Sequence, residues 1–138
     1  MAFFDHNIPN KKMEDLKLSA IGEAYDVWEL VKMPPVRSGN LIIHEMHVEG
    51  LAFNAANANL WHCNIEIRKK GVDIHFRNGD GHFSWVMPFY RLSMFQSEHL
   101  TIHSNGFFVR LKNGYTLKSN FFQLLISKKN EALNRHKP

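Results

Sequence analysis

The feature that most constrains the fold is a series of short segments within residues 60–112 in which apolar and polar residues alternate. For example, Cys63, Ile65 and Ile67 share one face of an expected strand. Turn residues separate the segments, and Asn78-Gly79 is the strongest of these signals. With one earlier segment, the pattern predicts seven strands at residues 41–48, 60–68, 72–77, 82–88, 91–96, 99–104 and 107–112. Short strands at regular spacing are typical of a partly open antiparallel barrel or sandwich.

A segment with helical spacing follows the strands, at residues 119–134. Its apolar residues cover about half of a helical circumference, which is broader than the stripe of an ordinary surface helix. They are Phe121, Phe122, Leu124, Leu125, Ile126, Ala132 and Leu133. Such a helix must be covered over much of its surface, so we expect it to cap the open end of the curled sheet. The predicted fold class is therefore mainly β with α (α+β).

The N-terminal part is expected to form a flexible leader over residues 1–12 and a helix over residues 13–33. Apolar residues recur at helical spacing in the second of these segments. Gly22 interrupts the pattern, because an interior glycine costs a helix about 1 kcal/mol. An alternative is a shorter helix that ends at Ile21, followed by a strand through residues 25–30.

Length and composition indicate an ordinary globular chain. Its 138 residues, 44% of them hydrophobic and 22% charged, are expected to form a single domain over residues 13–138. No run approaches the roughly 18 apolar residues that a membrane-spanning helix needs. Cys63 is the single cysteine, which excludes an internal disulfide and is typical of a reducing compartment. We therefore expect a cytoplasmic protein.

In the order of its elements, the chain resembles the pleckstrin-homology-like superfold, especially its bacterial and lipid-binding members. The resemblance covers residues 41–134 and rests on the hairpin of residues 64–77 and on a second hairpin, HLTIHSNGFFVRLKNG, that runs into the helix KSNFFQLLISKKNEAL. The long segment before residue 41 departs from the pattern of that superfold. The resemblance implies a curved sheet closed by the last helix, and a binding module. A fold shared by many unrelated binders does not determine the ligand.

Basic residues suggest an anionic partner. Residues 107–138 hold seven Lys or Arg and one acidic residue, and they account for the net charge of +4. In pleckstrin-homology domains that bind phosphoinositides, basic residues of an early hairpin hold the head group, and this resemblance implies a similar role for the hairpin here. Glu66 and Asp73 flank the basic residues, and an ordinary solvated surface is the alternative interpretation. The candidate ligand-binding residues are Arg68, Lys69, Lys70, Arg77, Lys128 and Lys129.

The spacing of the nine histidines argues against a metal site within any one strand. His99 and His103 would share a face, but strand rise separates them by about 13 Å, too far to bind one ion. His44 and His47 would point to opposite faces. Ligands from different strands could still converge, yet no helix carries a ligand motif. We expect neither a metal nor another cofactor.

Catalytic motifs are absent from the sequence. It contains no Gly-x-Ser-x-Gly elbow, no phosphate-binding loop and no dinucleotide fingerprint. Cys63 lies on the apolar face of its expected strand, which favours a buried and inert thiol. We therefore expect the protein not to be an enzyme.

The expected function is that of a non-enzymatic binding module, in which the exposed sheet edge beside the C-terminal helix accepts a protein or peptide partner. One alternative is peripheral binding of anionic lipid head groups through the basic hairpin. A second alternative is an enzyme or metal binder with a histidine-lined pocket. Numerous aromatic residues and an unpaired strand edge also suggest a homodimer. Nucleic acid is not an expected partner, because no recognition motif accompanies the positive charge.

Overall fold

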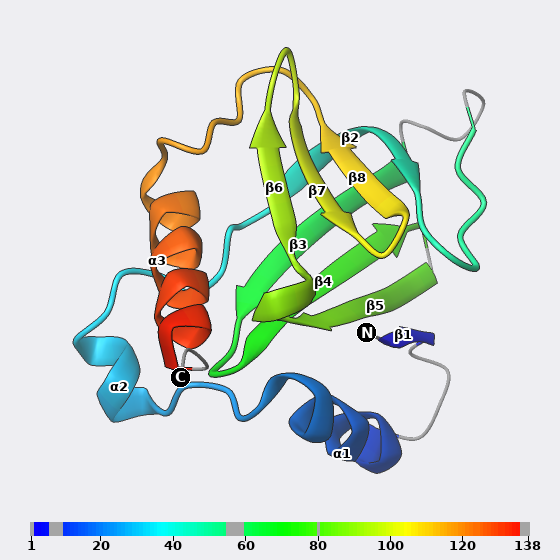
Figure 1. Cartoon of the computed structure of the whole chain (residues 1–138). Helices are drawn as coiled ribbons and strands as arrows, with labels where there is room; N and C mark the ends of the chain where they lie inside the picture. The colour runs from blue at the N-terminus through cyan, green and yellow to red at the C-terminus, as the bar shows by residue number, and fades with distance from the viewer. Residues whose placement is uncertain (1, 6–9, 55–59, 80, 136–138) are drawn as a thin grey trace.

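The structure, a computed structural model, describes residues 2–5, 10–54, 60–79 and 81–135. In these residues, eight strands form one open antiparallel sheet in the order β1-β5-β4-β3-β2-β8-β7-β6 (Figure 1). The strands are β1 (Ala2–Asp5), β2 (Leu41–His47), β3 (Trp61–Ile67), β4 (Gly71–Asn78), β5 (Gly81–Pro88), β6 (Ser93–Gln96), β7 (Leu100–Ser104) and β8 (Phe107–Leu111). The mainly β architecture with a C-terminal helix is therefore confirmed, with one strand more than expected.

Strands β2 to β8 are the seven that the alternating pattern predicts, and in β3 the pattern also predicts the buried face. In β2 the prediction of Ile42 and His44 on the buried face was wrong, because Leu41 and Ile43 are buried there and the register shifts after Ile43. In β3, Trp61, Cys63, Ile65 and Ile67 are all buried, while the residues between them are only partly buried. The buried residues lie in one continuous core with side chains from β2, β4, β5, β7 and β8. Burial of one face therefore sets the register of β3. A slip by one residue would turn its apolar side chains to the other face of the sheet.

Strand β2 joins the two halves of the sheet. Its first residues, Leu41 and Ile42, pair with β3, whereas the residues from Ile43 to His47 pair with β8. The register shifts between Ile43 and Glu45, which marks a bulge or irregularity. Bulges bend a strand and increase its twist. One half of the sheet, β1-β5-β4-β3, therefore turns into the other half, β8-β7-β6, through a single bent strand.

Helix α3 (Asn120–Arg135) packs against the inner, apolar face of this bent sheet. Phe122 and Leu125 are buried in the main core, and Phe121, Leu124 and Ala132 pack against it from the edges. Helix α3 also contacts the short 3-10 helix η2 (Phe89–Arg91), which connects β5 to β6. The sheet thus covers the central part of the apolar stripe, whereas Leu133 near the end of the helix remains exposed.

The N-terminal helix is shorter than the expected helix over residues 13–33. Helix α1 (Asn10–Ile21) ends at Ile21. The next residue, Gly22, has a φ of 76°, which lies in the left-handed region that suits glycine. A second helix, α2 (Val27–Val31), follows where the alternative prediction had a strand. Asp26 and Glu29 form a capping box at its N-terminus, which satisfies backbone donors that a strand would not leave open. The helix prediction was correct only in its shorter form, and the strand prediction was wrong.

Residues 2–5 form β1 where a flexible leader was expected. They pair with β5 from Ala2–Val86 to Asp5–Phe83 and so extend the sheet by one strand. Helix α1 then covers the outer face of β4 and β5, where a second small core forms. Its buried residues are Phe4, Met13, Ile21 and Val86. The remaining leader residues 1 and 6–9 lie outside the described part of the chain.

No helix among the described residues is long and apolar enough to cross a membrane.

Candidate functional site

The six basic residues suggested by the sequence do not form one cluster. Arg68 is buried at the end of the β3–β4 hairpin, and its guanidinium lies 3.8 Å from the Glu14 carboxylate on α1. Arg77 lies further along β4, on the outer face of the sheet. Arg68 thus joins α1 to the sheet, and its charge lies beside Glu14.

Lys69 and Lys70 remain exposed at the tip of the same hairpin. The ammonium group of Lys69 lies 3.2 Å from Glu29 and 3.7 Å from Glu23, and the hydrogen bond to Glu29 is the largest cause of its raised pKa. The aliphatic stem of Lys70 packs close to Gly22, where an added Cβ would come within 3.0 Å of Lys70 Cγ. Acidic residues of the N-terminal segment therefore already balance one of the two hairpin charges.

Lys128 and Lys129 extend from α3 in different directions. Lys128 lies 5.7 Å from the centre of the Tyr25 ring and 3.7 Å from the Glu131 carboxylate. Lys129 donates a hydrogen bond to the carbonyl of Leu92, at the end of η2, and burial lowers its pKa. Lys129 thus holds α3 beside the start of β6, while Lys128 borders an open cavity.

Two adjoining cavities bring Lys69, Lys70 and Lys128 together with apolar residues, and we call them the α3 groove. They have volumes of about 400 and 290 Å³, and both are lined by Lys69 and Ala132. The larger is also lined by Ser19, Ala20, Lys70, Pro88, Phe89, Tyr90 and Leu133. The smaller is also lined by Tyr25, Glu29, Lys128 and Glu131. The groove therefore lies between the hairpin tip, η2 and the C-terminal half of α3.

A second polar site lies on the outer face of β3, β4 and β5, and we call it the histidine face. It is a cavity of about 230 Å³ whose lining includes His62, His75, His82, Arg37 and Arg77. Strand register explains the gathering, because His62 pairs with Arg77, Arg77 pairs with His82, and His75 occupies the next outward position on β4. The Nδ1 atom of His75 lies 3.4 Å from Nε2 of His82.

Buried charges support one side of the histidine face. The Nε2 atom of His75 lies 3.2 Å from Asp73 and 3.6 Å from Glu66. Burial alone would raise the pKa of Glu66, but the hydrogen bond from His75 and the charge of Arg37 outweigh burial and lower it. Burial lowers the pKa of His82, and the charges of Arg77 and His75 add to this effect. Both effects favour the neutral form of the His82 imidazole.

The sequence suggested a histidine-lined pocket only as a second alternative and did not identify its residues, because the spacing of histidines was considered within single strands. The signal was present in the alternation, since His62, His75 and His82 each occupy an outward position of neighbouring hairpin strands. Asn40, which also lines the cavity, is brought in by the segment before β2, and its side chain lies 3.4 Å from His62. The position of Asn40 in the cavity could not be predicted from the hairpin pattern.

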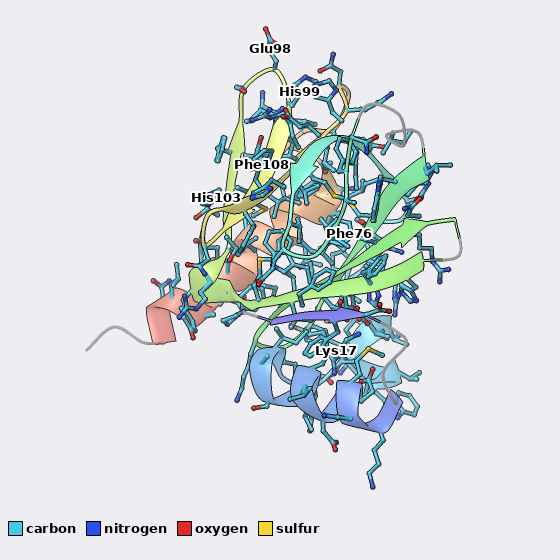
Figure 2. All side chains as sticks on the ribbon, turned by 90° about the vertical axis from the view of Figure 1, so that its right-hand side faces the viewer. Lys17, Phe76, Glu98, His99, His103 and Phe108 are labelled. Atoms are coloured by element: carbon cyan, nitrogen blue, oxygen red, sulfur yellow. The ribbon has the colours of Figure 1, made fainter. Side chains whose placement is uncertain are left out.

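Other histidines group on the opposite half of the sheet. The rings of His44 and His99 stack with their centres 4.2 Å apart. His103 on β7 is the register partner of Phe108 on β8, and both are labelled in Figure 2. Phe108 is in turn the register partner of His47 on β2. The rings of His44 and His99, and those of His47 and Phe108, therefore pack against each other on the sheet surface.

Cys63 is buried beneath the histidine face, and its burial disfavours the thiolate. Its side chain belongs to the inner core, and burial raises the pKa of the thiol from 9.0 to about 12. A thiol with such a pKa is protonated at neutral pH, whereas attack requires the thiolate. The expectation of a buried thiol is therefore confirmed.

Comparisons of the chain with protein-family models, curated proteins and solved structures find no match.

Proposed function

We propose that the chain is a non-enzymatic binding module that takes up an extended segment of a partner protein along β6 and the α3 groove. The observation that carries this proposal is the exposure of apolar side chains at the cavity of about 400 Å³. Tyr90 is 63% exposed and Leu133 is 36% exposed at its border. Large apolar side chains beside a cavity gain free energy when a ligand covers them.

Strand β6 supplies the second element of the proposed site. It is the last strand in the sheet order and, among the described residues, pairs only with β7. An edge strand offers backbone donors and acceptors to an added strand. Phe95 on this strand is 51% exposed, so it would contact side chains of a segment paired with β6. Since η2 leads directly into β6, a bound segment would pass from the edge into the α3 groove (Figure 1).

The charges at the groove favour a partner segment that combines apolar and acidic residues. Lys70 and Lys128 border the apolar lining, and Lys69 lies between them with its charge shared by Glu23 and Glu29. Charges at the rim of an interface mainly speed association and select the partner. Buried apolar anchors supply most of the affinity.

We also propose that the chain has the pleckstrin-homology-like superfold. The order of its elements, β2 to β8 followed by α3, supports this assignment. We also propose that the module acts in the cytoplasm, as its single cysteine suggests.

Binding of an anionic membrane through Lys69 and Lys70 is the competing function, since both lysines are exposed at the hairpin tip.

Selection of peptides from a random 12-residue library on the purified full-length chain tests the proposal. We expect enriched peptides to alternate apolar residues and to carry acidic residues beside them. Their affinity should fall at least tenfold for Tyr90→Ser and for Leu133→Asp. Leu60→Asp is the matched control, because Leu60 is also exposed but precedes β3, away from the groove.

Amide chemical shifts identify the surface that a selected peptide occupies. Changes confined to β6, η2 and α3 would support the proposed site. Equal binding by the two groove variants and the wild type, or shift changes elsewhere, would contradict it. Sedimentation with phosphatidylserine vesicles at low salt, lost on Lys69→Glu and Lys70→Glu, would instead favour the membrane function.

A further inference from the structure

We propose that His75 and His82 bind one divalent transition-metal ion of the zinc class on the histidine face. The ion would lie between Nδ1 of His75 and Nε2 of His82. This site is separate from the α3 groove, and the inference does not depend on the proposed peptide-binding function.

The two nitrogen atoms share a hydrogen bond in this structure, and their separation also matches that of two ligands of one metal ion, which would replace the shared proton. His75 Nδ1 and His82 Nε2 lie 3.4 Å apart. Two imidazole nitrogens that each bind a tetrahedral zinc ion at about 2.0–2.1 Å are separated by about 3.4 Å. The sheet holds this spacing, because β4 and β5 are paired over eight residues and both histidines face the same side. An ion could therefore bind without rearrangement of the backbone.

The surroundings of His75 orient its ring for metal binding. Its Nε2 atom lies 3.2 Å from Asp73 Oδ2 and 3.6 Å from Glu66 Oε1. In protein metal sites, a ligating histidine almost always donates its other N–H to a carboxylate, a carbonyl or water. These carboxylates favour the tautomer with its proton on Nε2, and that tautomer would leave the lone pair of Nδ1 on the side of His82.

The carboxylates themselves are poor candidates for direct ligation, although Glu66, Asp73 and His75 offer atoms within 4.8 Å of one another. Lys17 Nζ lies 2.7 Å from Asp73 Oδ2, and Arg37 lies 3.1 Å from Glu66 Oε2. A cation among these groups would have to displace an ammonium or a guanidinium group. The position on the opposite side of the His75 ring avoids this competition.

The cavity beside the histidine pair completes the site. Its volume of about 230 Å³ leaves room for water ligands, and His62 lines the same space. Imidazole ligands suit Zn²⁺, Cu²⁺ and Ni²⁺, whereas Mg²⁺ and Ca²⁺ prefer oxygen. Arg37 and Arg77 also line the cavity, so an anion could accompany the metal. The same residues make direct anion binding without metal the competing explanation.

Calorimetric titration of the metal-free, full-length chain with Zn²⁺ tests the site. We expect one equivalent to bind, EDTA to remove it, and affinity to fall at least tenfold in His82→Gln and His75→Gln. His44→Gln is the matched control, because His44 and His99 form another close imidazole pair. Its zinc affinity should equal that of the wild type.

Imidazole ¹⁵N chemical shifts of the wild-type chain provide a readout that does not depend on whether a variant folds. Zinc should shift Nδ1 of His75 and Nε2 of His82 and leave His44 unchanged. The inference is overturned if the wild-type chain binds no zinc, or if His82→Gln and the wild type bind zinc with equal affinity. Zinc binding that His44→Gln abolishes would also overturn it. Binding of inorganic phosphate by the metal-free chain, with no response to zinc, would assign the cavity to an anion instead.

Discussion

Lys17 on α1 forms an ion pair with Asp73 on β4, with 2.7 Å between Nζ and Oδ2, and both side chains are almost completely buried. Figure 2 shows Lys17 between its helix and the sheet. The pair joins the N-terminal helix to the strand that also carries His75. It thus connects the small outer core to the histidine face.

Removal of the lysine charge should destabilise the protein strongly. Lys17→Met leaves Asp73 as an uncompensated buried charge, and breaking a buried pair in this way costs about 3–5 kcal/mol. The measurement is the free energy of unfolding in urea. Lys12→Met, at an exposed position of the same helix, is the control and should change stability by less than about 0.5 kcal/mol.

A double variant separates the charge effect from lost packing. Lys17→Met with Asp73→Val removes both charges, and we expect it to be more stable than Lys17→Met alone. A double variant as unstable as the sum of the single variants would show that Lys17 acts by packing and not by neutralising Asp73.

Cys63 should make stability fall at alkaline pH. Its pKa rises from 9.0 to about 12 on burial, so between these values the unfolded chain loses a proton that the native chain keeps. The free energy of unfolding therefore decreases as pH rises through this window. We expect Cys63→Val to lose less stability than the wild type between pH 8 and 10, as measured by urea unfolding at each pH. An identical decrease in both proteins would contradict the assignment.

Gly71 should not tolerate a side chain. A Cβ at this position would meet the carbonyl oxygen of Met87, and would come within 2.7 Å of Ile21 Cγ2 and 2.9 Å of Pro88 Cα. Overpacking of this kind costs about 1–3 kcal/mol, and Gly71→Ala should also displace the end of α1. Hydrogen exchange of the α1 amides measures that displacement. Gly106→Ala is the control, since a Cβ there meets no described atom within 4 Å and only its φ of 86° is unfavourable.

The two sides of α3 should differ in their contribution to stability. Leu125 is buried in the main core, and Leu125→Ala should cost about 2–5 kcal/mol. Leu133 is 36% exposed at the α3 groove, so Leu133→Ala should cost less than about 1 kcal/mol. Thermal unfolding distinguishes the two variants. Equal losses would mean that Leu133 is part of the core and unavailable to a peptide.

Sequence by itself determined β2 to β8 and α3, because alternation and helical spacing are local patterns. Cys63, Ile65 and Ile67 are in the core for that reason. The break at Gly22 was also visible as a weak point in the helical pattern, although the longer helix was preferred. Local patterns were sufficient wherever burial followed directly from spacing along the chain.

Tertiary structure alone decided the features that depend on distant partners. Residues 2–5 become a strand because β5 offers them an edge, and Arg68 is buried because α1 places Glu14 beside it. Pairing of β3, β4 and β5 brings His75 to His82, and the packing of α1 brings Lys17 to Asp73. Each of these outcomes requires contacts between segments far apart in sequence, and the periodicity of one segment carries no information about the charge or backbone that will face it.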